Sequence, residues 1–300
     1  MKVLLIFVDG IGIGKKDKNN NPFFFTPLKT LPSILSGKLP SLRNRSIFSN
    51  KALLIPADAR LGVEGLPQSG TGQTSIFCGV NAPKIIGKHF GPYPYSELRT
   101  VIAEKNIFTV LKQQKKKVCF ANAYPKQFFE YIATGKLRLS ATTISCMMAG
   151  VPLRKIDELL KYEALSADMT GEGWKKFGYD FEPITPFQSG KNLYKLALKH
   201  DFTLYEYFHT DHAGHSMDKE FAKTTLMKLD GLLEGLLSNY DSNKLFVILV
   251  SDHGNLENIS VKTHTLNPVP VILMGKEKRK LANEIKDITD IYRVILKLIS

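Results

Sequence analysis

The chain has 300 residues, of which 43% are hydrophobic, and this fits a packed globular protein with one large domain or a domain plus a small insertion. No apolar run approaches the ~20 residues of a membrane-spanning helix, and the stretch at 3–8 is too short for a signal peptide, so we expect a cytoplasmic protein with no membrane partner. The net charge of +13 permits nucleic-acid binding, but the lysine-rich runs lack interleaved aromatic residues, which argues against it and favours attraction of anionic substrates.

Short apolar runs alternate with amphipathic segments along the chain. The apolar runs predict six buried strands, at 3–8, 52–55, 118–121, 202–208, 245–250 and 269–273. The segments between and after them predict helices, at 107–114, 187–199, 219–238 and 290–299. This alternation predicts an α/β protein, a three-layer αβα sandwich around a mostly parallel sheet.

The stretch from 125 to 186 interrupts this alternation. It predicts short helices, at 127–133 and 153–161, separated by joints that contain glycine and proline. We interpret residues 125–186 as a small cap inserted into a core made of residues 1–124 and 187–300.

Three aspartates follow three of the predicted strands. Asp9 ends the strand at 3–8, Asp211 follows the strand at 202–208, and Asp252 follows the strand at 245–250. Because ligands of open parallel sheets bind beyond the carboxyl ends of the strands, these carboxylates can converge at one edge. A single aspartate in such a place is often a turn former or a helix cap. Three of them, two with histidines nearby, favour a metal site.

Three histidines complete a possible ligand set. Asp211 and His215 have the spacing D-x-x-x-H, which places both on one face of a helical turn. His253 follows Asp252 directly, and His264 precedes the strand predicted at 269–273. Carboxylate oxygen and imidazole nitrogen suit Zn²⁺ or Mn²⁺. The predicted set is sufficient for two divalent ions and comprises Asp9, Asp211, His215, Asp252, His253 and His264.

A glycine-rich segment at 68–79 carries several hydroxyls. Ser69 lies just after Pro67 and leads into a predicted helix, whose first N–H groups would favour an anion. The local sequence is equally consistent with Ser69 as a nucleophile and with Ser69 as a helix cap. Thr71 and Thr74 offer further hydroxyls close by.

Taken together, these motifs resemble the alkaline phosphatase superfamily, in particular its metalloenzyme branch with cofactor-independent phosphoglycerate mutase and phosphopentomutase. The matching pieces occur in the family's order and span the whole predicted core: FVDG at 7–10, Ser69 ten residues before Gly79, DHAGH at 211–215, SDHGN at 251–255 and HTLNPVP at 264–270. The resemblance implies an alkaline phosphatase-like fold and Ser69 as a nucleophile that is also a metal ligand. It also implies how the ligands divide: Asp9, Ser69, Asp252 and His253 for one ion, Asp211, His215 and His264 for the other.

The sequence departs from the mutases between Ser69 and Asp211, where those enzymes carry a much larger inserted domain. The recognition residues of the family lie largely in that domain, so none can be transferred to this chain. Arg99, Lys88 and Lys126 are candidate phosphate contacts, and each is equally consistent with a solvated surface charge.

The predicted function is metal-dependent phosphoryl transfer through Ser69 on a small phosphorylated metabolite. With water as the second acceptor the chain would be a hydrolase, that is, a phosphatase or phosphodiesterase. With a hydroxyl of a retained substrate as acceptor it would be an isomerase, a phosphosugar or phosphoglycerate mutase. The alternative from another class is a non-catalytic protein that binds anions or nucleic acid on the same fold.

Overall fold

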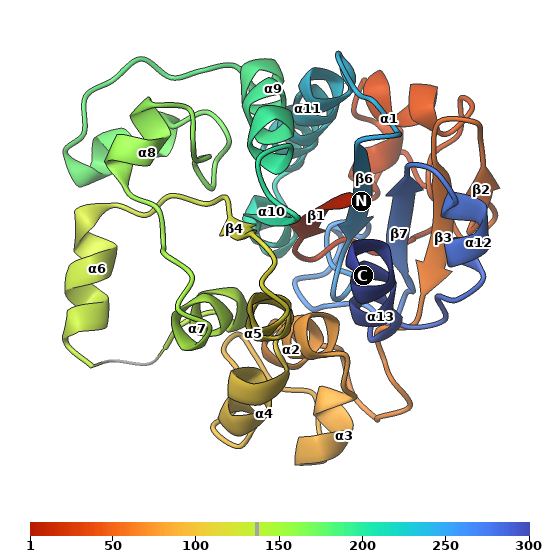
Figure 1. The fold of residues 1–300 in the computed structure, drawn as a ribbon. Helices are drawn as coiled ribbons and strands as arrows, with labels where there is room; N and C mark the ends of the chain where they lie inside the picture. The colour runs from red at the N-terminus through yellow and green to blue at the C-terminus, as the bar shows by residue number, and fades with distance from the viewer. Residues whose placement is uncertain (136–137) are drawn as a thin grey trace.

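The computed structural model describes residues 1–135 and 138–300, and its strands form one sheet in the order β2-β3-β7-β6-β1-β5-β4 (Figure 1). The strands are β1 (Lys2–Val8), β2 (Ile47–Phe48), β3 (Leu53–Ala57), β4 (Val118–Phe120), β5 (Phe202–Tyr207), β6 (Leu245–Val250) and β7 (Val269–Met274). β4, β5, β1 and β6 pair in parallel, β7 is antiparallel to β6, and β3 is antiparallel to β7. The sheet is therefore mixed but mostly parallel, as the sequence predicted.

The central strand β1 is hydrophobic on both faces because both faces are covered by helices. Leu4 and Ile6 belong to one hydrophobic core, whereas Val3 and Leu5 belong to a second core on the opposite face. Alternate side chains of a strand point to opposite faces of a sheet, so a continuous apolar run is what a central strand of a three-layer protein requires.

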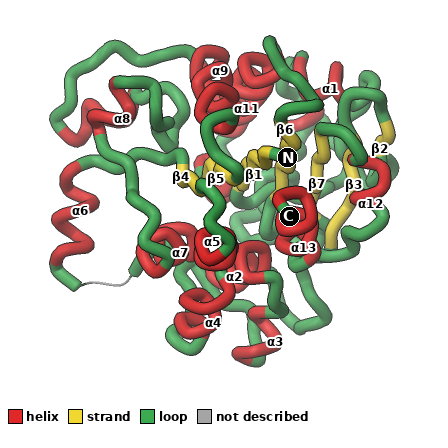
Figure 2. The backbone as a smooth tube through the Cα atoms, viewed as in Figure 1, coloured by secondary structure: helices red, strands yellow, loops and turns green. Residues whose placement is uncertain are grey.

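Helices lie on both sides of the strands (Figure 2). The α-helices are α1 (Thr30–Ile34), α2 (Ser69–Cys78), α3 (Ala82–Ile86), α4 (Leu98–Lys105), α5 (Ile107–Gln113), α6 (Lys126–Ala133), α7 (Ala141–Met148), α8 (Ile156–Leu160), α9 (Pro186–Ala197), α10 (His209–Ser216), α11 (Lys219–Leu237), α12 (Lys278–Ala282) and α13 (Asp290–Ile299). Two short 3-10 helices are η1 (Pro22–Phe24) and η2 (Glu172–Phe177). α1, α9 and α11 cover one face, and α2, α5, α7, α12 and α13 cover the other.

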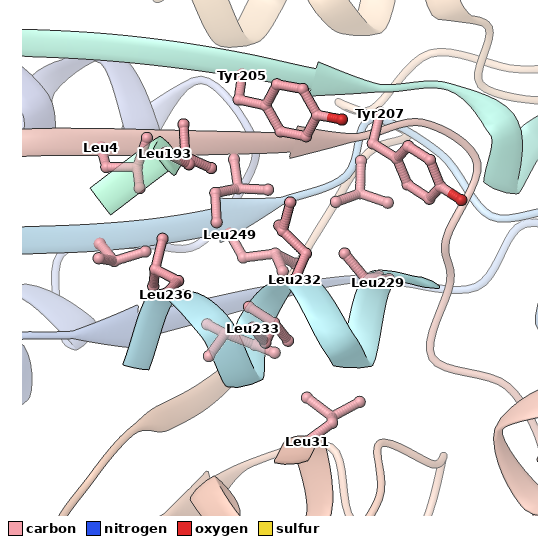
Figure 3. Packing of buried hydrophobic residues seen from close by; sticks show 14 of the residues in the cluster. Leu4, Leu31, Leu193, Tyr205, Tyr207, Leu229, Leu232, Leu233, Leu236 and Leu249 are labelled. Atoms are coloured by element: carbon pink, nitrogen blue, oxygen red, sulfur yellow. The ribbon is translucent and has the colours of Figure 1, made fainter. Parts of the chain in front are cut away.

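The first face depends on a close crossing of α9 and α11. Leu229, Leu232 and Leu236 of α11 project toward the strands, and Leu193 of α9 joins the same core (Figure 3). The two backbones approach so closely at Gly235 that a Cβ there would overlap the carbonyl oxygen of Phe187.

Two features of the sheet differ from the sequence prediction. β2 was not predicted, because a strand of two residues carries too little periodicity to be recognised. The reversed direction of β7 could not be predicted either. A buried apolar run looks the same whichever way the strand runs, and direction is set by how the connections cross the sheet.

The segment 125–186 contains α6, α7, α8 and η2, and its residues 136 and 137 lie outside the described residues. α7 packs against α2, α4 and α5 and contributes Ala141 and Cys146 to the second core. α6 and α8 lie farther out, on the side of the sheet where β4 is found (Figure 1). A small cluster that includes Leu159 and Trp174 has its own packing there. The boundaries of the cap stay a prediction.

Among the described residues, no helix combines the length and the apolar character that crossing a bilayer requires.

The glycine at the α9–α11 crossing provides a test of this packing. We expect Gly235→Ala to lower the free energy of unfolding by about 1–3 kcal/mol, because the added methyl overlaps backbone that cannot move aside. Gly231→Ala in the same helix is the control, since its Cβ would lie 3.1 Å from the side chain of Pro186 and the gain of ~1 kcal/mol in helix propensity offsets the tight contact. Urea denaturation measures both. Equal stabilities of the two variants would contradict the close crossing.

Candidate metal centre

The three aspartates predicted to converge lie at one edge of the sheet. β6, β1 and β5 are adjacent parallel strands, so their carboxyl ends coincide. Asp9 follows β1, Asp252 follows β6, and Asp211 lies on α10, which begins just after β5. The parallel register thus brings together side chains that lie far apart in the sequence.

One group of side chains forms around Asp9, Asp252 and His253. These three offer ligand atoms that all lie within 4.8 Å of one another. His253 Nε2 is 3.2 Å from Asp9 Oδ1 and 3.7 Å from Asp252 Oδ2. Ser69 Oγ approaches the same histidine nitrogen at 3.0 Å. All four residues are buried, and Asp252 and His253 are fully so.

A second group forms around Asp211, His215 and His264. His215 Nε2 is 3.2 Å from Asp211 Oδ2 and 3.2 Å from His264 Nε2. His264 Nε2 is 3.7 Å from Asp211 Oδ1. The ring of His264 stacks on His253 with 3.7 Å between centroids, so the two groups are adjacent. His253 also lies within reach of Asp211 and His264 as a possible shared ligand.

The hydrogen bonds of two histidines fit a cation in the second group. His215 Nδ1 is 2.6 Å from the carbonyl oxygen of Lys262, and His264 Nδ1 is 2.7 Å from that of Pro67. A carbonyl only accepts, so each Nδ1 carries a hydrogen, and in the neutral imidazole each Nε2 presents a lone pair to the cluster. Metal-ligating histidines commonly have this arrangement. The two lone pairs face each other at 3.2 Å and repel unless a proton or a cation lies between them.

The first group has the same unmet need for positive charge. Asp252 Oδ2 is buried and receives no hydrogen bond from the residues that the structure describes. Burial and the negative charge of Asp9 raise the pKa of Asp252 well above its ordinary value. Burial would lower the pKa of His253, but the charge of Asp252 and the hydrogen bond to Asp9 outweigh it and raise that pKa to about 10. A divalent cation would supply the charge that these groups otherwise take from protons.

The positive charge of His253 also acts on the neighbouring group. Burial and that charge together lower the pKa of His264 to about 4, so its imidazole is neutral and able to bind a metal at neutral pH. Burial would raise the pKa of Asp211, but the hydrogen bond with His215, the positive charge of His253 and the hydrogen bond from Asn255 together outweigh it and lower that pKa. An ionised carboxylate beside a neutral imidazole is a donor pair suited to Zn²⁺ or Mn²⁺.

Comparison with known proteins agrees with this geometry. The family model described as "Metalloenzyme superfamily" matches residues 167–299. The 2,3-bisphosphoglycerate-independent phosphoglycerate mutase of Methanococcus aeolicus is 30% identical over 112 residues, which are 37% of this chain and 27% of the relative. That of Methanocaldococcus jannaschii is 29% identical over 98 residues, 32% of this chain and 23% of the relative. The matched part thus spans about a quarter of the length of these relatives.

Solved structures match over nearly the whole chain. The PH0037 protein from Pyrococcus horikoshii has a TM-score of 0.60 at 14% identity, covering 99% of this chain and 96% of that one. The alkaline phosphatase from the Antarctic bacterium TAB5 has a TM-score of 0.57 at 15% identity, covering 99% and 97%. The chain is therefore similar to the alkaline phosphatase-like metalloenzyme superfamily, in sequence over its C-terminal part and in fold over nearly its whole length. The match to the metalloenzyme family model and the two groups of ligand atoms support binding of divalent metal.

Two neighbouring hydroxyls of α2 have different surroundings. Ser69 is the first residue of the helix, and its Oγ faces His253 of the metal cluster. The hydroxyl of Thr71 instead donates to the carbonyl of Gln68 at 3.1 Å and accepts the N–H of Phe90 at 3.2 Å. Thr71 therefore fixes a loop, whereas Ser69 faces the cluster.

Sequence reasoning did not assign a role to Asn255. Its Nδ2 donates to Asp211 Oδ1 at 2.7 Å and so orients a carboxylate of the second group from the loop of the first. Gly214 permits this contact, since a Cβ there would lie 2.6 Å from the Asn255 amide. The only signal in the sequence was the position of Asn255 directly after Asp-His-Gly, which does not reveal its contact with α10.

The three basic residues considered as phosphate contacts are dispersed. Lys88 lies over the rings of Phe90 and Tyr95, at 5.6 and 5.2 Å from their centroids. Lys126 begins α6, is exposed, and pairs with Glu130 at 3.3 Å. Arg99 lies half-buried on α4. Their contact with a substrate phosphate stays a prediction.

Metal removal tests the cluster as a whole. We expect Mn²⁺ or Zn²⁺ to raise the midpoint of thermal unfolding and a chelator to lower it, because a ligand that binds only the folded state adds about 2.7 kcal/mol at a hundred times its Kd. Differential scanning calorimetry measures the shift, and elemental analysis counts the ions, for which we expect two per chain. Asp252→Asn should reduce both. An unfolding midpoint that is the same with metal and with chelator would contradict the assignment.

Proposed function

We propose that the chain transfers a phosphoryl group from a small phosphate ester to Ser69 and then to a second acceptor. The observation that carries this proposal is the position of Ser69 Oγ among the predicted metal ligands. It lies at the first turn of α2 and 3.0 Å from His253 Nε2, inside a cluster of carboxylates and imidazoles that needs positive charge.

Two divalent cations, Mn²⁺ or Zn²⁺, fit the donor set. One would be held by Asp9, Asp252 and His253 together with Ser69, and the other by the group Asp211, His215 and His264. When bound, such ions stabilise a deprotonated hydroxyl and the negative charge on phosphoryl oxygens.

The chain's own groups account for the remaining requirements of the reaction. Ser69 Oγ forms the bond to phosphorus while the bond from phosphorus to the ester oxygen breaks, and the alcohol leaves with a proton. Ser69 begins α2, and the positive end of the helix dipole at that terminus favours a dianionic phosphoryl group. A second acceptor then attacks the phosphoserine and restores the hydroxyl of Ser69.

Hydrolysis is the version we favour, with water as the second acceptor and an ester of a small metabolite as the substrate. The phosphatase neighbours and the net charge of +13, which attracts anions, support it. The phosphoglycerate mutases that match over about a quarter of their length support the second version, in which a hydroxyl of the retained substrate is the acceptor. A non-catalytic anion-binding role is the alternative of another class.

A screen of phosphorylated metabolites and phosphodiesters, with Mn²⁺ and Zn²⁺ added separately, separates these versions. Release of inorganic phosphate indicates a phosphatase, and release of one alcohol together with a phosphate monoester, without free phosphate, indicates a phosphodiesterase. A positional isomer of the substrate indicates a mutase. Binding of the esters without any turnover indicates the non-catalytic role.

Removal of the nucleophile tests the covalent step. We expect Ser69→Ala to lower kcat/KM by a thousandfold or more, on the order seen when a covalent nucleophile is deleted. Folding should change little, because the contact of this hydroxyl is with the metal cluster and Gln68 occupies the N-cap position.

Thr71→Val is the matched control, since it removes the neighbouring hydroxyl and keeps the shape of the side chain. It should retain most of the activity, with some loss of stability from the broken loop contacts. An active Ser69→Ala beside an inactive Thr71→Val would move the nucleophile to Thr71. Full activity of both variants would refute the covalent mechanism.

A further inference from the structure

Glu257 is a buried carboxylate beside the metal cluster that does not belong to the predicted ligand set. Only 2% of its surface is exposed. It lies in the loop between β6 and β7, five residues after Asp252. A carboxylate at this depth requires strong hydrogen-bond partners, so the identity of its partners indicates what it holds in place.

Each oxygen of this carboxylate accepts two hydrogen bonds, and all four donors are neutral. Oε2 accepts the backbone N–H groups of Gly12 and Asn255, both at 2.8 Å. Oε1 accepts the hydroxyl of Thr265 and the side-chain amide of Asn267, the latter at 3.0 Å. The donors come from three separate segments: the loop after β1, the loop after β6, and the segment before β7.

The backbone of two of these segments packs directly on the Glu257 side chain. A Cβ at Gly12 or at Gly254 would overlap its carboxylate oxygen Oε1. Glycine at these two positions therefore lets the loops approach closely enough for the N–H groups to reach the carboxylate. The close fit leaves the loops little freedom to move relative to one another.

The same donors lie next to the predicted ligands. Gly12 is three residues after Asp9, and Asn255 is two residues after His253. A shift of either loop relative to Glu257 would therefore move a ligand of the first metal group. One carboxylate thus sets the separation of two ligands that come from different strands.

The second metal group is connected in the same way. Thr265 directly follows His264, and its N–H also donates to the carbonyl of Gly254 at 2.9 Å. Asn255, whose N–H is held by Glu257, donates its side-chain amide to Asp211. Glu257 therefore acts on loops that carry ligands of both groups.

We propose that Glu257 is a positioning residue that sets the spacing of the two cation sites by holding three ligand-bearing segments, from two loops, on one carboxylate. The proposal rests on the metal-dependent function proposed above, but its test reads metal affinity and does not depend on turnover. Removing a residue that orients metal ligands without binding the metal itself typically lowers metal affinity about 10–100-fold.

The chemistry of the four donors separates positioning from a simple need for negative charge. The N–H groups of Gly12 and Asn255 cannot reverse, so they require an acceptor. The hydroxyl of Thr265 and the amide of Asn267 can reorient and accept instead. A glutamine can satisfy all four, with its oxygen toward the backbone and its NH₂ toward Thr265 and Asn267. A methionine of similar length satisfies none.

The experiment titrates the metal-free chain with Mn²⁺ by calorimetry and measures unfolding of the metal-free chain in urea. We expect Glu257→Met to weaken Mn²⁺ binding about 10–100-fold and Glu257→Gln to change it only a few-fold. Thr265→Val removes one donor, should fold in any case, and should weaken binding at the site that includes His264 more than at the other site. At saturating Mn²⁺, most of the activity lost in Glu257→Met should return.

Asp290→Asn is the control for loss of a buried carboxylate. Asp290 also accepts a backbone N–H, that of Lys286 at 2.8 Å, but it begins α13. Tyr292 of that helix packs on Gly79 at the C-terminal end of α2, opposite to Ser69. This variant should lose stability and keep its Mn²⁺ affinity.

Three results would overturn the proposal: a folded Glu257→Met with unchanged Mn²⁺ affinity, Glu257→Gln as weak as Glu257→Met, or Thr265→Val with both sites unchanged. The second would show that charge and not orientation is what matters. A wild-type chain that binds Mn²⁺ without transferring phosphoryl groups would refute the proposed function, while the order of affinities among the variants would still decide the role of Glu257.

Discussion

The mutual repulsion of carboxylates in a buried place is the constraint on which the rest of the structure depends. Asp9 and Asp252 lie beside the same histidine, away from water, and Asp211 lies close to the next one. Charges of one sign so placed are costly unless positive charge joins them. In the metal-free chain that charge comes from protons, which is why the pKa of Asp252 and that of His253 are both raised. Divalent metal would satisfy the same need for positive charge.

The scaffold is built to enforce this crowding. Adjacent parallel strands end at one edge of the sheet, and glycines remove the side chains that would keep the ends apart. Gly10 has a φ of +70°, and a Cβ there would lie 2.6 Å from Asp211 Oδ1. At Gly72 of α2 a Cβ would lie 2.9 Å from the Cβ of Asp252, so the helix can bring Ser69 into the cluster. Histidine–carbonyl bonds, Asn255 and the Glu257 carboxylate then hold the ligands in place.

Away from this edge, we expect substrate specificity to come from the predicted cap at residues 125–186. Solved structures share this fold over nearly the full chain at only 14–15% identity. Many different sequences can satisfy the same packing constraints. The segment 125–186 contains the short helices α6 and α8, whereas α7 of the same segment packs in the second hydrophobic core.

The sequence by itself determined the class of fold, six of the strands, and the residues of the cluster, because strand-end aspartates and spaced histidines leave a local signature. It did not determine the directions of β3 and β7, the short strand β2, or the role of Thr71, since buried apolar runs and small-residue loops look alike whatever they pack against. Asn255 and Glu257 also required the tertiary structure. Their partners lie on other strands, and a hydrogen bond between segments far apart in the chain leaves no periodicity and no spacing to read.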